Sequence, residues 1–292
     1  MQPYQIQVII PVYNGQLTLG RCLDSLVSQT YLQWQALIVD DGSTDDSFHI
    51  MKEYAAQDGR FVCLRAGKNG GPTRARNLAL EKADAPYIAF LDADDTWEPD
   101  MLEVLYRAAV NRNADVVQCQ FLYELPGGER LYPKGAFSQD VFLEGKELRA
   151  VYLRMLTGIN MNHVCMKLIR RSCLEGVRFR TELKTAEDLD FCVRLFQNVR
   201  SYYFTTNRLY HYFRCTGSLT GGGLSLFQRF DANREVSRTI AAALPRWGMN
   251  GPGYRVLAWG RPYLVACSKA LRILREKWRE SRNKRRCSSE SK

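Results

Sequence analysis

The 292-residue sequence predicts an α/β fold in which a mainly parallel sheet carries helices on both faces. Two observations support this prediction. Strand-like and helix-like segments alternate through about the first hundred residues. The strand-like segments are short, continuous apolar runs, which are typical of parallel strands buried on both faces.

The elements of the first part follow from local patterns. The expected strands are residues 5–11, 36–39, 61–64, 87–91 and 115–123. The expected helices are residues 18–29, 43–56 and 73–82, and a further one that has Pro99 in its first turn. Ser43 is the expected N-cap of the second helix, because Asp46 follows it at the spacing of a capping box.

The pattern is looser after residue 125. Residues 125–135 predict a turn-rich hairpin, and residues 217–225 predict a flexible joint. Between and after them we expect helices at 145–155, 187–196, 226–243 and 255–284, and a strand at 202–213. The sequence therefore predicts a helical C-terminal extension on the α/β domain.

Composition narrows the class of protein. The chain is 46% hydrophobic and 25% charged, as expected for a folded soluble protein. No secretory signal and no apolar stretch of about 20 residues, the length that spans a bilayer, is visible. The nine cysteines are scattered without a C-x-x-C pair, which favours reduced thiols in a cytoplasmic protein over a disulfide framework or zinc site.

The net charge of +10 is concentrated in the C-terminal tail. Residues 269–286 hold nine Lys/Arg against two Glu, a net of +7, which leaves +3 for the rest of the chain. With the apolar stripe through Tyr263, Leu264 and Leu271, this predicts a basic amphipathic helix. Two interpretations are equally weighted: the helix binds an anionic membrane surface, or it packs on the domain with a solvated outer face. Nucleic acid is not expected as a partner.

Polar clusters follow three of the expected strands. They are Tyr13-Asn14, Asp40-Asp41 and Asp92-Ala93-Asp94. Ligands bind beyond the carboxyl ends of strands in open α/β sheets, so the topology predicts one site built from all three clusters.

Each cluster has a functional and a structural interpretation. Asp92 and Asp94 can share a Mn²⁺ or Mg²⁺ ion, or they can simply favour a helix N-terminus. Asp40-Asp41 can accept a hydrogen bond from a nucleobase, or form a turn with an N-cap. Residues 68–77 bring glycines and two arginines to a helix start, either as an anion cradle or as a plain turn.

An ordered set of motifs resembles the inverting glycosyltransferase family 2. The motifs are IIPVYNG, LIVDDGSTDDS, NGGPTRARNLAL and YIAFLDADD, followed more weakly by KLIRRSCLEGVRF, TAEDLDFCVRL and YHYFRCTGSLT. The resemblance implies a GT-A fold. It divides the chain into a nucleotide-sugar-binding half (1–112), an acceptor-binding and catalytic-base half (113–220), and the helical extension with its basic tail (221–292).

The resemblance also implies roles for residues on the donor side. Pro11, Tyr13 and Asn14 would contact the nucleotide, as would Ala93 in the acidic turn. Asp40 or Asp41 would recognise the base, with Asp41 favoured, and Arg74 or Arg76 would face the nucleotide. Asp92 would lie near the ribose and the metal, and Asp94 would ligate the metal through the diphosphate.

On the acceptor side, Glu187 and Asp188 match the acidic pair of the family, with Asp188 as general base. Without the resemblance, an acidic first helical turn is the better explanation of this pair. His211 and Arg214 match a segment that can fold over the diphosphate. Met166 departs from the family, because many relatives carry a polar residue there.

The implied function is transfer of a sugar from a nucleotide donor, UDP-linked in the first instance, to a glycan or lipid-linked acceptor. The expected setting is polysaccharide synthesis in the cytoplasm, with peripheral attachment to the inner face of the cell membrane as the further expectation. Two alternatives stay open: a metal-dependent nucleotidyltransferase, and a non-catalytic nucleotide-sugar-binding module. The absence of a Gly-rich triphosphate loop near the N-terminus counts against the first, and intact Asp92, Asp94 and Asp188 count against the second.

Overall fold

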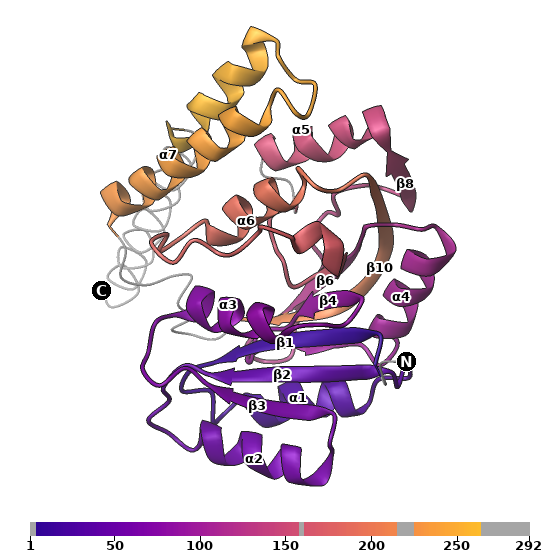
Figure 1. Ribbon diagram of the computed structural model, residues 1–292, viewed down its shortest axis with the longest axis vertical. Helices are drawn as coiled ribbons and strands as arrows, with labels where there is room; N and C mark the ends of the chain where they lie inside the picture. Colours follow the sequence, from indigo (N-terminus) through magenta and orange to yellow (C-terminus); the bar gives the residue numbers. More distant parts are fainter. Residues whose placement is uncertain (1–3, 158–160, 215–224, 264–292) are drawn as a thin grey trace, which may run out of the picture.

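A computed structural model describes residues 4–157, 161–214 and 225–263. One sheet runs through it in the order β3-β2-β1-β4-β9-β6-β10-β5, with β7 paired to β6 and β8 paired to β10. Helices cover both faces (Figure 1): α3 and α6 lie on one side of the sheet, and α1 and α2 lie on the other.

The first half alternates strands and helices, as the sequence predicts. Its strands are β1 (Ile6–Val12), β2 (Trp34–Asp40), β3 (Phe61–Arg65) and β4 (Tyr87–Phe90). Its helices are α1 (Leu19–Val27), α2 (Ser47–Gln57), α3 (Pro72–Lys82) and α4 (Met101–Asn111). The pairs β1–β2, β1–β4 and β2–β3 are all parallel. Because helices cover both faces, nearly every residue of β1 and β2 is buried.

The second half of the sheet is mixed. It contains β5 (Thr96–Trp97), β6 (Val116–Glu124), β7 (Arg130–Leu131), β8 (Val141–Glu144), β9 (Lys167–Arg170) and β10 (Ser201–Phe213). Strand β9 lies between β4 and β6 and is antiparallel to both. The predicted hairpin is confirmed, since β6 and β7 pair antiparallel.

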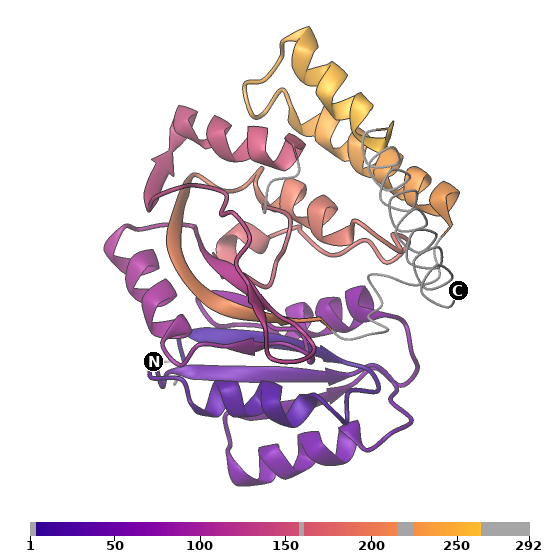
Figure 2. The same cartoon turned by 180° about the vertical axis from the view of Figure 1, so that it is seen from behind.

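The remaining helical elements are two 3₁₀ turns (Gly145–Leu148 and Arg171–Leu174), α5 (Arg149–Thr157), α6 (Glu187–Leu195) and α7 (Leu226–Ala243), and residues 252–263 are also helical. Helices α5, α6 and α7 lie on the same side of the sheet as α3 (Figure 1). Helix α7 packs on the outer side of α6 (Figure 2). Thr239 of α7 donates a hydrogen bond to Asp190 Oδ1 of α6 at 2.7 Å. The joint predicted at 217–225 falls largely, and the basic tail at 269–286 wholly, outside the described residues.

Two helix starts differ from the prediction. Helix α2 begins at Ser47 after Asp46, and not after Ser43. The reason is that Ser43 is used elsewhere: its amide donates to Asp40 Oδ1 at 2.9 Å and its hydroxyl accepts from the Asn14 amide at 3.0 Å. Helix α4 begins at Met101, so Pro99 lies just before the helix.

The cysteines of the described residues are free, and five of them are buried, as predicted for core thiols. In the ranges that the structure describes, no helix is both long and apolar enough to cross a bilayer.

Candidate functional site

The carboxyl ends of β1, β2 and β4 meet at one edge of the sheet. Val12 is in register with Asp40, and the Asp41 amide donates to the Val12 carbonyl at 2.8 Å. On the other side of β1, the Leu91 amide donates to Ile9 at 3.0 Å, so the acidic turn 92–95 leaves the sheet at this edge too. The topology therefore brings the three polar clusters together.

The first cluster combines an open aromatic ring with a strained backbone. The Tyr13 side chain follows β1 and is 47% exposed, which leaves its ring free to stack on a flat ligand. Asn14 has a φ of 48°, in the left-handed region that Asn tolerates, and its Oδ1 accepts from the Thr44 amide at 2.9 Å. Pro11 lies on β1 opposite Val39, beyond the last residue of β1 that pairs with β4.

The two aspartates at the end of β2 are both buried, and each holds a loop. Asp40 accepts from the Ser43 amide at 2.9 Å and pairs with Arg65 at 3.1 Å. Asp41 accepts from the amides of Gly70 and Gly71, the shortest at 2.6 Å. Asp41 thus ties the Gly-rich loop before α3 to the end of β2. Base recognition by Asp41 stays a prediction, and it would use the remaining acceptor sites of this carboxylate.

Gly42 is needed for this arrangement. Its φ is +78°, and a Cβ atom there would lie 2.8 Å from the Asn69 amide nitrogen. The loop that Asp41 holds therefore passes too close for any side chain at position 42.

A buried arginine offsets part of the negative charge of the acidic turn. Arg76 is buried, and its Nη2 donates to Asp92 Oδ1 at 2.7 Å. The Cys165 thiol donates to the other oxygen of Asp92 at 3.3 Å. Arg76 thus points inward, toward the carboxylates, and a contact of Arg74 or Arg76 with the nucleotide stays a prediction. Arg74, the alternative, is exposed on the loop side of α3, with Nη1 3.5 Å from the Lys68 carbonyl.

Asp94 differs from Asp92 because, among the described residues, no side chain pairs with its carboxylate. Burial and then the charge of Asp92 raise its pKa. A carboxylate that lacks a cation and sits beside another carboxylate suits a hard divalent ion, so these residues fit Mn²⁺ or Mg²⁺. Among the described residues, no three or more His, Cys, Asp or Glu side chains are grouped so that they alone could hold a metal ion. A metal here would complete its shell with water and substrate oxygens.

Asp95 is a site residue that the sequence motifs do not single out. It is buried, and it accepts from the Phe213 amide at 2.9 Å and from the Tyr210 hydroxyl. Burial, followed by the charges of Asp92 and Asp94, raises its pKa well above the ordinary range. Asp95 thereby anchors the end of β10 to the acidic turn.

A second contact reinforces this anchor. The Arg21 guanidinium stacks on the Phe213 ring at 3.5 Å, and its Nη2 donates to the Asp94 carbonyl at 2.8 Å. The backbone of the acidic turn is thus fixed from both α1 and β10.

The acidic pair of α6 reaches the same centre. Helix α6 begins at Glu187 after Ala186, whose φ is 61°. Asp188 Oδ1 lies 3.4 Å from Arg76 Nη1, so one guanidinium joins Asp188 to Asp92. Burial raises the pKa of Asp188 even though Arg76 acts to lower it. Burial, and then the charge of Asp188, raise the pKa of Glu187.

The predicted diphosphate contacts lie on β10 and just after it. His211 is buried between two carboxylates, with Nδ1 2.9 Å from Glu124 and Nε2 2.8 Å from Glu98. Both ring nitrogens are used, so in this conformation His211 does not reach toward a diphosphate. Arg214 packs over the Tyr123 ring at 4.0 Å, next to residues 215–224, which are not described.

Comparison with known proteins identifies the family. The sequence profile described as Glycosyl transferase family 2 matches residues 7–178, more than half of the chain. The chain belongs to this family.

The chain is similar in sequence to bacterial glycosyltransferases. The chain is 33% identical to EpsH of Bacillus subtilis over 218 residues, which is 73% of this chain and 61% of EpsH. It is 31% identical to the cholesterol galactosyltransferase of Borreliella burgdorferi, over 74% of this chain and 62% of that protein. The chain thus spans about three fifths of the length of each.

The structural neighbours confirm the predicted fold class. S. aureus TarS 1–349 in complex with UDP-GlcNAc has a TM-score of 0.69 at 22% identity, covering 83% of this chain and 70% of TarS. The mannosyltransferase PcManGT from Pyrobaculum calidifontis, in complex with GDP-Man and Mn²⁺, has a TM-score of 0.53 at 16% identity. The match covers 91% of this chain and 87% of PcManGT. At these identities the likeness concerns the fold alone.

Proposed function

We propose that this protein transfers a sugar from a nucleotide-sugar donor to the hydroxyl of a glycan or lipid-linked acceptor, with inversion at the anomeric carbon. The observation that carries the proposal is the Arg76 bridge, which holds Asp92 of the acidic turn and Asp188 of α6 at one centre. Donor-side and acceptor-side carboxylates must lie this close for a single displacement. The family membership gives the reaction class.

Asp188 is the proposed general base. An acceptor hydroxyl is a weak nucleophile, so a carboxylate has to take its proton as the new glycosidic bond forms, an effect of about 10²–10⁴-fold. Burial raises the pKa of Asp188, which makes it a better proton acceptor than an ordinary carboxylate. Glu187, its neighbour on the first turn of α6, is the second candidate.

The donor side supplies binding and charge compensation. Tyr13, Asn14, Pro11 and Ala93 surround the proposed nucleotide position, and Asp41 is the proposed contact for the base. A divalent ion bound at Asp94, with Asp92 beside it, would offset the negative charge that the departing diphosphate gains. The UDP-GlcNAc complex of TarS supports a UDP-linked donor, and the complex of PcManGT with GDP-Man and Mn²⁺ supports a metal.

The division of the chain into a donor half (1–112) and an acceptor half (113–220) remains part of the proposal. One sheet runs through both halves, so they act as parts of a single domain. His211 and Arg214 enter the proposal only as residues next to the segment that would cover the diphosphate. They would have to leave their present contacts with Glu98, Glu124 and Tyr123 to do so.

The test is donor cleavage by Asp188→Asn. With UDP-GlcNAc and Mn²⁺, we expect UDP release to fall at least about 100-fold while UDP affinity stays unchanged. Asp231→Asn is the matched control: this half-buried aspartate of α7 pairs only with Arg234 among the described residues, and its replacement should leave both unchanged. Wild-type turnover in Asp188→Asn would remove the base assignment, and pyrophosphate release from a nucleoside triphosphate would favour a nucleotidyltransferase.

The proposal includes peripheral attachment to an anionic membrane on its cytoplasmic side. In the described part of the C-terminal extension, Val256, Trp259 and Tyr263 recur at helical spacing and are 70%, 47% and 63% exposed. The tail that follows carries the excess of Lys/Arg, and an apolar stripe with basic neighbours fits an anionic lipid surface.

Vesicle co-sedimentation tests this attachment. Binding to vesicles of phosphatidylglycerol and phosphatidylcholine should weaken in Trp259→Ser but not in Leu32→Ser, which changes an apolar residue elsewhere that is more exposed (67% against 47%). Equal binding to neutral and anionic vesicles would contradict the proposal.

A further inference from the structure

Lys167, the first residue of β9, is completely buried. Its Nζ donates to the Met161 carbonyl at 3.0 Å and to the His163 carbonyl. Among the residues that the structure describes, no carboxylate forms an ion pair with this amine. Lysine is almost never fully buried without a paired charge, so a buried lysine of this kind indicates a functional role.

The surroundings of the amine favour its charged form. Burial lowers the pKa of Lys167, but the nearby Asp188 carboxylate acts to raise it. The two carbonyl oxygens also favour the ammonium, because hydrogen bonds to the charged form stabilise that form. Three buried thiols near the amine are neutral, since burial raises the pKa of each: Cys119, Cys165 and Cys192. Asp188 is therefore the negative charge on which the Lys167 ammonium acts.

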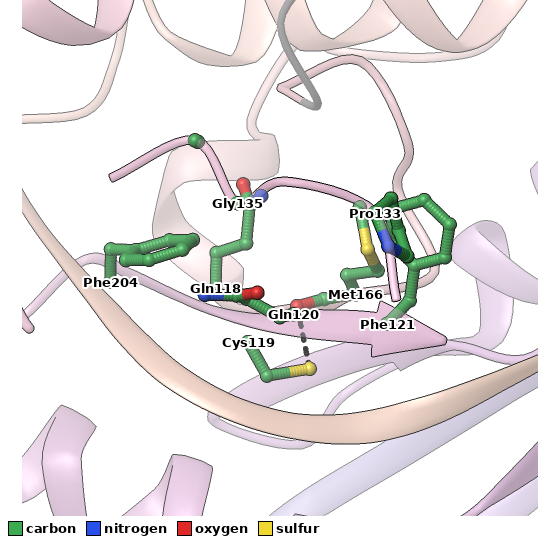
Figure 3. Close-up of a pocket in the computed structure, with 9 residues that line it drawn as sticks. Gln118, Cys119, Gln120, Phe121, Pro133, Gly135, Met166 and Phe204 are labelled. Atoms are coloured by element: carbon green, nitrogen blue, oxygen red, sulfur yellow. Dashed lines mark hydrogen bonds between the residues drawn. The ribbon is translucent and has the colours of Figure 1, made fainter. Parts of the chain in front are cut away.

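Residues 161–166 form a loop before β9, the pre-β9 loop, and its end contacts the donor side of the centre. The Cys165 thiol donates to Asp92 Oδ2 at 3.3 Å. The Met166 carbonyl accepts from the Cys119 amide at 3.1 Å and from the Cys119 thiol of β6 at 3.6 Å (Figure 3). The end of the pre-β9 loop is thus fixed both to the sheet and to the acidic turn.

The beginning of the pre-β9 loop contacts the helix of the proposed base. The Cys192 thiol of α6 donates to the Asn162 carbonyl at 3.5 Å. Cys192 follows Asp188 by four residues, so the face of α6 that carries the proposed base is turned toward this loop. Lys167 binds the carbonyls on either side of Asn162, and so holds the part of the loop that α6 contacts.

We infer that Lys167 is a positioning residue for the proposed base: it fixes the pre-β9 loop between Asp92 and α6, and its charge keeps Asp188 ionised. The inference rests on the proposed function, in which Asp188 accepts the proton of the acceptor hydroxyl. Burial disfavours a carboxylate, and a cation that is itself shielded from water stabilises it strongly. Arg76 supplies such a cation by direct contact, and Lys167 supplies a second one without an ion pair.

Other titratable groups also face Asp188, and the test has to separate them from Lys167. They are Arg76 of α3, Asp92 of the acidic turn, His163 and Cys165 of the pre-β9 loop, and Glu187 and Cys192 of α6. His163 matters most for the test, because an imidazole ordinarily titrates near neutral pH. Burial lowers the pKa of this imidazole.

Two variants separate the charge of Lys167 from its hydrogen bonds. Lys167→Gln removes the charge and keeps an N–H donor, whereas Lys167→Met removes both. Lys82→Met is the matched control, because Lys82 is an exposed lysine in the last turn of α3. The titration of Asp188 is followed by its ¹³C carboxyl signal, which is assigned by its loss in Asp188→Asn. UDP release from UDP-GlcNAc with Mn²⁺ is measured over the same pH range.

In both Lys167 variants we expect the midpoint of the Asp188 titration to move to higher pH by about one pH unit, the low end for losing a nearby opposite charge. The acidic limb of UDP release should move with it, and Lys82→Met should move neither. The same movement is expected when His163→Asn is added to each protein, which separates it from the imidazole. Lys167→Met should also unfold at a lower urea concentration than Lys167→Gln, because two carbonyls lose their donor.

An Asp188 titration that is the same in wild type and both Lys167 variants overturns the inference, and so does a wild-type Asp188 that is still protonated at pH 7. The second result needs no Lys167 variant to fold. If the wild type releases no UDP from any UDP-sugar, the proposed function fails separately, and the carboxyl signal still decides the role of Lys167.

Discussion

Replacing Arg76 with methionine should destabilise the fold in a pH-dependent way. The Arg76 side chain is 6% exposed and pairs with Asp92 at 2.7 Å and Asp188 at 3.4 Å. Removing one partner of a buried ion pair costs about 3–5 kcal/mol. The two carboxylates are 30% and 25% exposed, so water screens them, and we expect a loss of about 2–3 kcal/mol at pH 8.

The pH dependence has a definite sign. Burial already raises the pKa of Asp188 in the wild type, and Arg76 opposes that rise. Without Arg76 the pKa rises further, so the folded variant binds protons more tightly than the unfolded chain. The free energy of unfolding of the variant therefore falls as pH rises. Its deficit relative to wild type should be smaller at pH 5 than at pH 8.

Urea denaturation followed by circular dichroism at both pH values measures this deficit. Arg107→Met is the control, because Arg107 is 73% exposed and pairs with Glu103 within one helix. It should cost no more than about 0.5 kcal/mol at either pH. A deficit for Arg76→Met below about 1 kcal/mol, or one equal at both pH values, would refute the electrostatic account of the centre.

Three further predictions concern the same edge of the sheet. Asp95→Ala leaves the Phe213 amide without its acceptor and should lower the free energy of unfolding by about 2–4 kcal/mol, measured by urea denaturation. Gly42→Ala places a Cβ 2.8 Å from Asn69 N at a φ of +78°; calorimetry should show weaker UDP binding, and unchanged affinity would count against the loop geometry. Because burial raises the pKa of Asp188, the acidic limb of the pH–rate profile should lie above pH ~4, and a limb at that ordinary carboxyl value would argue against Asp188 as base.

Local sequence patterns were sufficient for most of the elements. Helix α7 starts and ends where the periodicity predicts, and the strands of the first half differ from prediction by one or two residues. Short apolar runs separated by turn signals are recognisable because helices bury both faces of these strands. Strand β9 is not predicted by such a pattern, because it has four residues, includes the buried Lys167, and pairs antiparallel with two strands distant in sequence.

The position of the candidate site could be predicted from the sequence, but the contacts between its side chains could not. Strand ends converge by topology, so the acidic turn and Asp41 could be placed at one edge from sequence alone. The Arg76–Asp188 contact joins residues 112 positions apart, and no local pattern encodes such a pair. The role of Asp95, the third aspartate of the turn, follows from its hydrogen bonds to Tyr210 and Phe213 of β10, which the sequence does not indicate.

The most direct test of the central claim is calorimetric titration of UDP with and without Mn²⁺, for wild type and Asp94→Ala. The claim is that the acidic turn after β4 holds a metal-bound nucleoside diphosphate. It predicts that Mn²⁺ strengthens UDP binding to the wild type and that Asp94→Ala removes most of this gain. If neither UDP nor GDP, TDP or CDP binds in a manner that depends on Mn²⁺ and Asp94, the claim is contradicted.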